Sequence, residues 1–322
     1  MNVRPFDWRD IPALSRKQGE CVFLDSALLL TRGPLLLPGA LLSYLSPATG
    51  IFTNVVENEK NPPLIGQIIH LLGTPFAHLT FMLPAAALSQ PSVSILTEYL
   101  VTIAGERGAL RLLADVDEQS DAFETLRQCG FATFTRQRIW QLSKIASGSQ
   151  PPSGWRDAIS QDAIAIRSLY NNLVPGLVQQ IEPLIAKRPR GMVYYQDGEL
   201  RAYVEIKYGR RGIWVQPFIH PDAEDVPERL AGLLVKIHYR SSRPVYICVR
   251  SHQSWLEAVI EDLGAAASPR QAVMVKHLAI QQKAARPLTV PALEGGQAEI
   301  SAPIARAGAA SHGEQSNNLW NK

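Results

Sequence analysis

The 322-residue sequence has few features of a disulfide-bonded, zinc-binding or nucleic-acid-binding protein. Its three cysteines, Cys21, Cys129 and Cys248, are far apart, odd in number and without CxxC spacing. They indicate small core residues in a reducing compartment rather than a disulfide or zinc framework. The formal net charge is only +3, and no block of Lys and Arg occurs. We therefore predict no nucleic-acid partner.

Long apolar runs are also missing. The N-terminus has no apolar segment of the kind that signal peptides carry. The most apolar stretch, residues 28–45, is interrupted by Arg32, Pro34 and Pro38, whereas a spanning helix needs about 20 mostly apolar residues. The stretch predicts two short buried helices or turns, and we expect a cytoplasmic protein without membrane contact.

Motifs of familiar chemistry are absent as well. The sequence contains no GxSxG, HExxH or Walker-type motif and no cluster of Cys and His. We therefore expect no metal ion, and no chemistry can be assigned from a single local signature.

Hydrophobic residues make up 46% of the chain, enough for two ordinary domains with a core each. Residues 143–154 are rich in Ser, Gly and Pro and predict a linker. Residues 281–322 lack apolar periodicity and predict a disordered tail. We therefore expect one domain over residues 1–142 and a second over residues 155–280.

Both domains are expected to have the same order of elements. In the first, a strand at 3–6 and a helix begun near Asp10 precede strands at 50–57, 64–73 and 77–84. A helix at 92–108, a strand at 109–116, a helix at 120–130 and a strand or hairpin at 131–142 follow. The second repeats this order from 155 to 279. Asp197-Gly198 predicts a hairpin turn there, and Ser254 with Glu257 a capping box.

A short pattern occurs twice at an offset of 134 positions. Gly130 is followed by Arg136-Gln137, and Gly264 is followed by Arg270-Gln271. Six identities fall between residues 119 and 137 and their counterparts. At the domain fronts, Arg4 and Asp10 correspond more loosely to Arg156 and Asp162. An internal duplication explains these matches. For the two arginines near the domain ends, a structural ion pair is the simpler expectation.

The repeated order and the segment QSDAFETLRQCGF resemble the GNAT acetyltransferases, whose closing motif commonly runs Asn-x-x-Ala-x-x-x-Tyr-x-x-x-Gly-Phe. Ala122, Gly130 and Phe131 match this motif, and Gly264 matches it in the second copy. The resemblance covers most of residues 3–142 and 155–279. It implies an α+β protein with two GNAT-like domains, each a mixed, mostly antiparallel twisted sheet flanked by helices. Contact between the two copies is expected.

The resemblance also implies an acyl-CoA site, for acetyl-CoA or another acyl-CoA, in a V-shaped opening between the fourth and fifth strands. The fourth strand would bind it through Phe81, Met82 and Leu83 in the first copy, or through Val215 and Gln216 in the second. The pyrophosphate would lie at the start of the following helix, where backbone N–H groups are free.

Both copies depart from the family pattern. Neither retains the glycine-rich phosphate loop, and acidic residues precede the helix in the second copy: Asp222, Glu224, Asp225 and Glu228. Leu126 and Ile260 replace the tyrosine that often serves as a general acid, and neither can donate a proton. We expect both to pack in the core.

Two candidate bases for deprotonating an amine remain, Glu205 and His78, each with an ordinary structural role as the alternative. One hypothesis is an N-acyltransferase in which a small-molecule or protein amine attacks the thioester directly, with backbone N–H groups of the fourth strand as oxyanion donors. The other is a catalytically silent tandem GNAT fold that binds a small molecule or a protein. The sequence does not identify the acceptor.

Overall fold

The computed structural model describes residues 2–58, 61–142, 154–184, 189–238 and 242–278. The expected tail and all of the expected linker except Gly154 lie outside these residues. Chain contacts group residues 1–280 into one unit. We call residues 2–142 the first half and residues 154–278 the second half; the predicted domain bounds stay a prediction.

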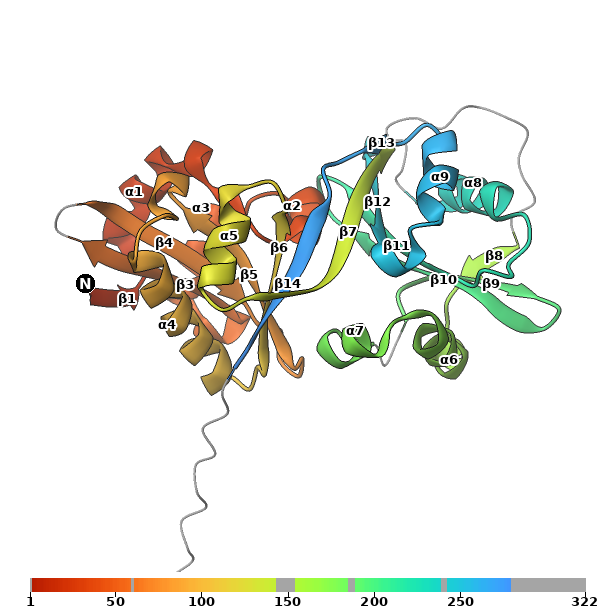
Figure 1. The fold of residues 1–322 in the computed structure, drawn as a ribbon, viewed down its shortest axis with the longest axis horizontal. Helices are drawn as coiled ribbons and strands as arrows, with labels where there is room; N and C mark the ends of the chain where they lie inside the picture. The colour runs from red at the N-terminus through yellow and green to blue at the C-terminus, as the bar shows by residue number, and fades with distance from the viewer. Residues whose placement is uncertain (1, 59–60, 143–153, 185–188, 239–241, 279–322) are drawn as a thin grey trace, which may run out of the picture. The chain divides into compact units, whose positions relative to one another are not determined.

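The first half contains the expected elements (Figure 1), together with one additional strand, β2. Short 3-10 turns aside, the order is β1 (Asn2–Pro5), α1 (Ile11–Arg16), β2 (Val22–Phe23), α2 (Ser26–Arg32), α3 (Leu36–Leu45), β3 (Ile51–Asn58), β4 (Asn61–Ile69), β5 (Phe76–Leu83), α4 (Ser92–Glu106), β6 (Arg111–Asp117), α5 (Asp121–Gln128) and β7 (Ala132–Leu142). The apolar stretch 28–45 forms the two short helices that its prolines and glycines predicted.

The second half repeats this order. It consists of β8 (Trp155–Asp157), α6 (Ala163–Leu173), α7 (Gly176–Ile181), β9 (Gly191–Gln196), β10 (Glu199–Tyr208), β11 (Ile213–Ile219), α8 (Val226–Lys236), β12 (Val245–Arg250), α9 (Leu256–Asp262), β13 (Ala266–Ala267) and β14 (Gln271–His277). Asp197 and Gly198 both have positive φ, as the predicted hairpin turn requires.

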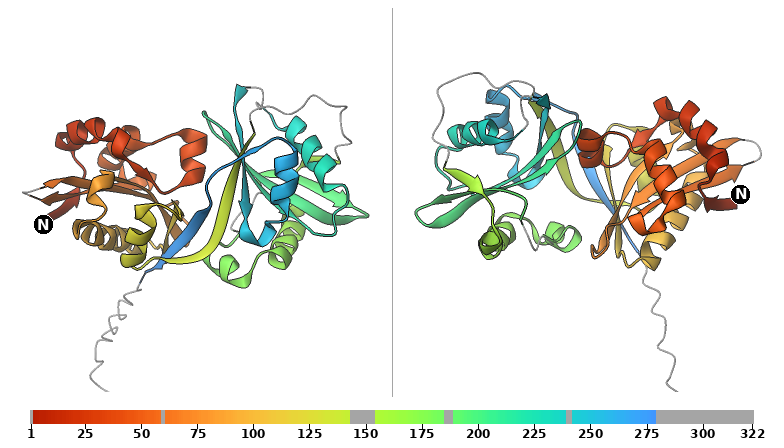
Figure 2. Two further views of the ribbon diagram at one scale, coloured as in Figure 1. Left: turned by 45° about the horizontal axis from the view of Figure 1, so that its top comes forward. Right: turned by 180° about the vertical axis from the view of Figure 1, so that it is seen from behind.

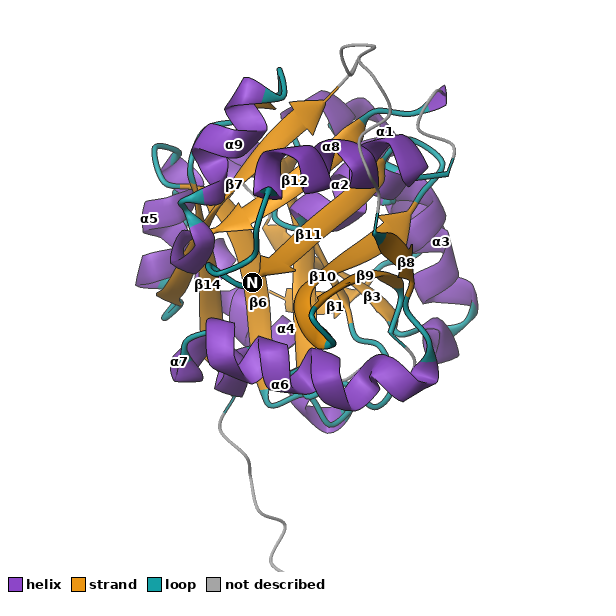
Figure 3. Cartoon of the chain, turned by 90° about the vertical axis from the view of Figure 1, so that its right-hand side faces the viewer, coloured by secondary structure: helices purple, strands orange, loops and turns teal. Residues whose placement is uncertain are grey.

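Helices cover both faces of each half's sheet, and the fold class is confirmed. In the second half, α6 and α7 pack on one face and α8 and α9 on the other (Figure 3). In the first half, α1 and α3 lie opposite α4 and α5. Pairing is antiparallel except between β5 and β6 and between β11 and β12.

The last strands of the two halves are exchanged, which the sequence did not predict. β14 of the second half pairs with both β6 and β7, and β7 of the first half pairs with β12 (Figures 1 and 2). The strands therefore form one continuous sheet. Each core contains residues from the other half: Ala272, Met274 and Leu278 complete the core around α4, and Trp140 and Leu142 the core around α8.

The repeated Arg-Gln pairs lie at the centre of this exchange. Gln137 and Gln271 are direct partners in the β7–β14 ladder, and Gln137 Nε2 donates to Gln271 Oε1 over 2.9 Å. When equivalent residues pair with each other, a local twofold axis passes between them. The offset of 134 thus relates two strand segments that meet at a pseudo-twofold axis.

The duplication also appears at the two fronts. Arg4 donates two hydrogen bonds to Asp10, at 2.7 and 2.8 Å, and Arg156 donates two to Asp162, both at 2.7 Å. Each aspartate also accepts the backbone N–H three residues before it. Two such pairs with the same spacing and geometry support the internal duplication.

One local expectation was wrong. Ser254 forms no side-chain cap, because a 3-10 turn at Ser251–Gln253 runs into α9 and makes Trp255 the N-cap residue. The sequence also left β2, α7 and β13 unassigned. Among the described residues no single helix is long and apolar enough to cross a membrane, although the bent pair α2 and α3, 104° apart, meets the length and composition criteria together.

Candidate functional site

Both halves contain the V-shaped opening that the resemblance implied. β5 and β6 pair over three positions, ending at His78 and Leu113, and β11 and β12 pair over three, ending at Val215 and Ile247. Beyond these positions the strands separate. Backbone groups on the inner edge of the fourth strand would then be open to a ligand. The two openings differ in what fills them.

The first opening is filled by the chain itself. In β2, Val22 pairs with Met82 and Phe23 pairs with Phe81. Leu24 then bridges the gap, because its N–H donates to Thr80 O over 2.9 Å and its carbonyl accepts Asp115 N–H over 2.8 Å. A ligand that paired with β5 as an added strand would need these same backbone groups. The first half therefore does not fit an acyl-CoA in the expected position.

The filling segment, Cys21–Arg32, is an insertion that we call the strap. Ile51 follows Asp10 by 41 positions, whereas Gly191 follows Asp162 by 29. The difference equals the length of the strap. No feature of its sequence marks it as a strand that enters a sheet, since only two of its residues form one.

The strap continues onto the second half. Ala27 and Leu30 pack against Ile139, Trp214 and Cys248. Thr31 O accepts the backbone N–H of Arg211 over 2.9 Å. A Cβ on Gly209 would collide with the Thr31 carbonyl, so glycine is required at this close approach. The strap thus fills one opening and braces the sheet that contains the other.

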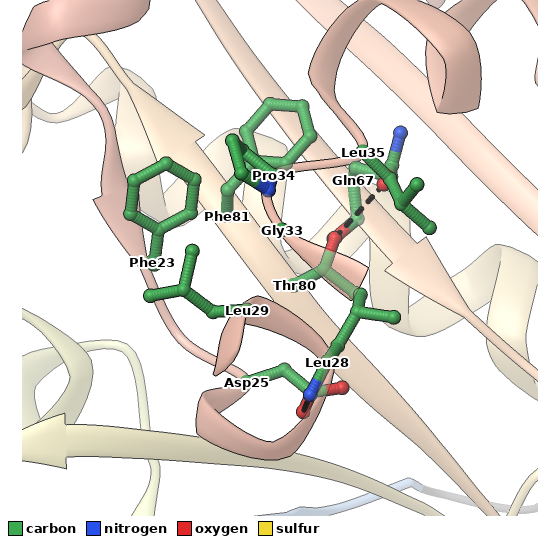
Figure 4. A pocket seen from close by; sticks show the side chains of 10 residues that line it. All are labelled: Phe23, Asp25, Leu28, Leu29, Gly33, Pro34, Leu35, Gln67, Thr80 and Phe81. Atoms are coloured by element: carbon green, nitrogen blue, oxygen red, sulfur yellow. Dashed lines mark hydrogen bonds between the residues drawn. The ribbon is translucent and has the colours of Figure 1, made fainter. Parts of the chain in front are cut away.

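A small pocket lies between the strap and the first half's sheet (Figure 4). It is shallow and partly open to solvent, and most of the residues that line it are apolar. At its floor, Thr80 Oγ1 donates to Gln67 Oε1 over 3.1 Å, and Gln67 Nε2 donates to Thr53 Oγ1 over 2.9 Å. Asp25 Oδ1 accepts Leu28 N–H over 2.9 Å. Its floor is therefore internally hydrogen-bonded.

The first-half residues named from the sequence lie around the filled opening. Phe81, Met82 and Leu83 are 2%, 0% and 1% exposed. Two of them pair with β2 as described. His78 sits at the last paired position, where its ring meets Phe76 edge-on at 5.4 Å between centroids. These four residues are near one another, but the strap occupies the space that a ligand would need.

The second opening differs from the first in the backbone groups on the inner edge of its fourth strand, β11. Gly209 N–H donates to Gly212 O and His220 N–H donates to Arg201 O, and these bonds set the alternation along β11. The inner edge facing β12 therefore carries the backbone of Ile213, Val215, Pro217 and Ile219. Pro217 has no N–H to offer a ligand carbonyl. At the wide end, Gln253 Nε2 donates to Ile219 O over 2.8 Å. Among the described residues, no strand pairs with this edge beyond Val215.

Three residues named from the sequence converge beside the second opening. Val215 ends the paired stretch, and Gln216 follows it on β11. Glu205 on β10 is the direct cross-strand neighbour of Gln216, so their side chains share a sheet face. The Glu205 carboxylate lies 3.4 Å from Lys207 Nζ and is 28% exposed. It is thus a solvent-reachable carboxylate one strand away from the gap.

Sequence reasoning missed a charged group on the other edge of this opening. Arg250, the last residue of β12, contacts Glu182 with Nη2 at 3.2 and 3.1 Å from the two carboxylate oxygens. Although burial lowers its pKa, Glu182 and other neighbours hold the pKa of Arg250 above its ordinary value. Burial, and then Arg250, lowers the pKa of His252 to about 4, so this imidazole is neutral. No sequence motif links residues 182, 250 and 252.

The N-termini of α4 and α8 provide few groups that could bind a phosphate. Pro91 is the N-cap residue of α4 and Asp225 that of α8, and neither side chain caps its helix. Asp225 is in the left-handed region and lies 3.9 Å from Arg229.

Leu126 and Ile260 are 2% and 0% exposed, which confirms that they pack in the core. Arg136 pairs with Glu118 at 2.6 Å, the structural role expected for it. Among the described residues no group of three His, Cys, Asp or Glu side chains could hold a metal ion.

No family model and no curated protein sequence matches the chain. Solved structures do. A GCN5-related N-acetyltransferase from Sphaerobacter thermophilus aligns with a TM-score of 0.53 and 10% identity, over 86% of this chain and 95% of that chain. A tandem GNAT protein from the clavulanic acid biosynthesis pathway aligns at 0.48 and 14%, over 86% and 98%. An acetyltransferase from Pyrococcus horikoshii, described as putative, aligns at 0.49 and 13%, over 88% and 91%.

The likeness extends across both halves, because an 86% alignment reaches well beyond either one. At 10% identity it concerns the fold. The chain has the GNAT acetyltransferase fold, in tandem, with two openings of which one is filled by the strap.

Proposed function

We propose that the chain is an acyl-CoA-dependent N-acyltransferase with one working cleft, between β11 and β12 of the second half. The observation that carries this proposal is the asymmetry of the two openings. Leu24 bridges the first opening by backbone hydrogen bonds on both sides. In the second, no described strand takes the inner edge of β11 beyond Val215, and a buried nitrogen of Arg250 on β12 forms no hydrogen bond with any described residue.

An acyl-CoA bound there supplies the activated acyl group. The residues of this chain that would hold it are the backbone of Val215 and the side chains along the ends of β11 and β12. Glu205 is the base in this proposal, since its partly exposed carboxylate can take a proton from an ammonium directly or through one water. Lys207 Nζ lies 3.4 Å from that carboxylate and holds it in place by charge attraction.

The test separates binding from turnover. Acetyl-CoA is titrated by calorimetry, and CoA release is followed with a set of amines: an aliphatic diamine, amino acids, an arylalkylamine and an amino sugar. We expect saturable heat, and release with at least one class. Glu205→Gln should lower the release rate by about 10²–10⁴-fold at unchanged affinity, the range of a lost general base. Glu199→Gln is the matched control, because Glu199 lies on the same strand, is exposed and pairs with Arg201.

His78→Ala provides the contrast between halves. Since the strap fills the opening beside His78, this variant should leave affinity and rate unchanged. If His78→Ala loses both acetyl-CoA affinity and CoA release while Glu205→Gln remains active, the site must lie in the first half. No heat at millimolar acetyl-CoA would end the proposal altogether.

A catalytically silent tandem GNAT fold is the second candidate, and specific observations favour it. Pro217 lacks the N–H that would bind an acyl oxygen, and Gln253 occupies the carbonyl of Ile219. The acidic approach to α8 repels a phosphate, and Leu126 and Ile260 are buried where a tyrosine is common. This candidate predicts no CoA release with any amine in the same assay.

A further inference from the structure

At the ends of β11 and β12, one strand lacks a hydrogen-bond donor and the other has a donor without a partner. On β11, the inner edge lacks one backbone N–H because position 217 is proline. On β12, the Arg250 guanidinium has a donor without a partner: Nη1 is buried and forms no hydrogen bond with any described residue. A buried donor left unsatisfied costs about 1–3 kcal/mol, so such groups in native proteins call for a water or a ligand.

Arg250 is positioned beside the separated part of the opening. It lies three residues past Ile247, the last β12 residue that pairs with β11. Strand alternation puts its side chain on the same face as Cys248, which packs against Trp214. That face is covered by α6 and α7, which pack on Phe218 of β11. Gln216 points to the same face as Phe218, and so does Glu205, its cross-strand neighbour on β10.

The guanidinium is held rather than mobile. Its side chain is 11% exposed, and Nη2 lies 3.2 and 3.1 Å from the two Glu182 oxygens. Glu182 is fixed in turn, because its backbone carbonyl accepts the Tyr170 hydroxyl over 2.6 Å. With Nη2 committed to Glu182, Nη1 is the buried nitrogen that has no partner among the described residues. A planar guanidinium fixed at one nitrogen presents the other in a set direction.

We propose that Arg250 Nη1 is the hydrogen-bond donor to the acyl carbonyl in the second opening, in place of the N–H that Pro217 lacks. This inference rests on the proposed function. A fixed, charged donor aimed at an oxygen that gains negative charge stabilises the transition state more than the ground state. Pro217 is then no obstacle to acyl transfer, since the donor comes from the opposite strand.

The experiment compares ligands with and without a carbonyl. Acetyl-CoA and CoA are titrated by calorimetry into the full chain. In the wild type, acetyl-CoA should bind on the order of tenfold more tightly, the scale of one charge-assisted bond. Arg250→Gln should remove this preference and leave CoA affinity unchanged. Infrared difference spectra of acetyl-CoA labelled with ¹³C at the carbonyl should show a lower stretching frequency in the wild type than in Arg250→Gln.

The chain offers a matched control. Arg138 on neighbouring β7 pairs with Glu257 at 2.8 Å and has a buried Nε without a partner, but it lies on the opposite sheet face. Arg138→Gln should keep the acetyl-CoA preference and the carbonyl shift. If Arg250→Gln alone fails to fold, the double variant Arg250→Gln with Glu182→Gln removes both charges of the pair, and its acetyl-CoA preference should be lost likewise.

The outcomes separate the two proposals. Absence of heat with both ligands overturns the proposed function and this inference with it. Binding of acetyl-CoA with equal affinity for CoA, or a preference and a carbonyl shift that survive in Arg250→Gln, overturns the role of Arg250 alone. Loss of the preference in Arg250→Gln together with its retention in Arg138→Gln supports it.

Discussion

Met274 tests the strand exchange directly, because it belongs to the last strand of the second half but is buried in the core of the first. Its side chain is 0% exposed and packs in the cluster that contains Leu96 and Leu100 of α4. If β14 serves the first half, truncation of Met274 to alanine must weaken the protection of α4, which is about 170 residues earlier in the chain.

The expected size follows from burial. Truncating a fully buried methionine to alanine costs about 2–5 kcal/mol, from the lost transfer energy and the cavity left behind. At the lower end, opening of the first half becomes about thirtyfold more frequent, since 1.4 kcal/mol is a factor of ten. Against a total stability of about 5–15 kcal/mol, a loss at this lower end leaves the variant folded at room temperature.

Hydrogen exchange followed by mass spectrometry supplies the readout. Peptides from α4 should exchange faster in Met274→Ala, whereas peptides from α8 should change less. Ile260→Ala is the reciprocal variant, because Ile260 is 0% exposed and belongs to the core around α8. Faster exchange of α8 with α4 unchanged in Met274→Ala would contradict the exchanged pairing and return the strand to its own half.

Three further predictions can be tested by measuring the stability of the folded chain. The pKa of His252 is about 4 in the folded chain against an ordinary value of 6.5, so the unfolded chain takes up its proton first as pH falls. The free energy of unfolding, measured with denaturant, should therefore fall as the pH is lowered from about 6.5 to 4. If the difference in this free energy between the wild type and His252→Gln does not change over that range, the explanation is wrong. Asp162→Asn should cost about 1–3 kcal/mol, more than Asp10→Asn, because Asp162 also accepts the Tyr195 hydroxyl at 2.8 Å; equal losses in urea would be unexpected. Since Arg156 holds the pKa of Asp162 well below its usual range, this stability is present above the ordinary carboxyl pKa and is lost in acid. Gly209→Ala should lower the Tm because its Cβ meets the Thr31 carbonyl, whereas Gly19→Ala, with open space around it, should not.

The sequence predicted the elements well because each half's pattern is local. Helix α4 and the strands of both three-stranded meanders follow from periodicity, prolines and glycines that act within a few residues. The Arg-Gln repeat also identified the duplication. Its meaning in space was hidden, since nothing in a strand's own residues says which strand it will pair with. β14 in fact pairs in register with two strands of the first half, β6 and β7.

The candidate site was less accessible to prediction for a related reason. Val215, Gln216 and Glu205 could be named because the meander and its fourth strand are recognisable along the chain, and their roles stay a prediction. Glu182 and Arg250 were missed because they are 68 positions apart and meet only through the covering of one sheet face. The strap was missed because its two-residue strand has no periodicity to detect. Polar residues brought together by tertiary packing leave no local signal.

The exchanged strands and the strap together explain how one opening can be filled by the chain while the other is not. Each half depends on the other for a strand, so neither can lose its fold without disturbing its partner. Each half can still change its opening, because the gap lies beyond the three paired positions that hold the fourth and fifth strands together. In the first half the strap added hydrogen bonds across the gap and an apolar contact with Trp214 on the other side of the junction. The first opening is thus part of the support for the second, and the function that we propose for the second depends on Arg250 and Glu205.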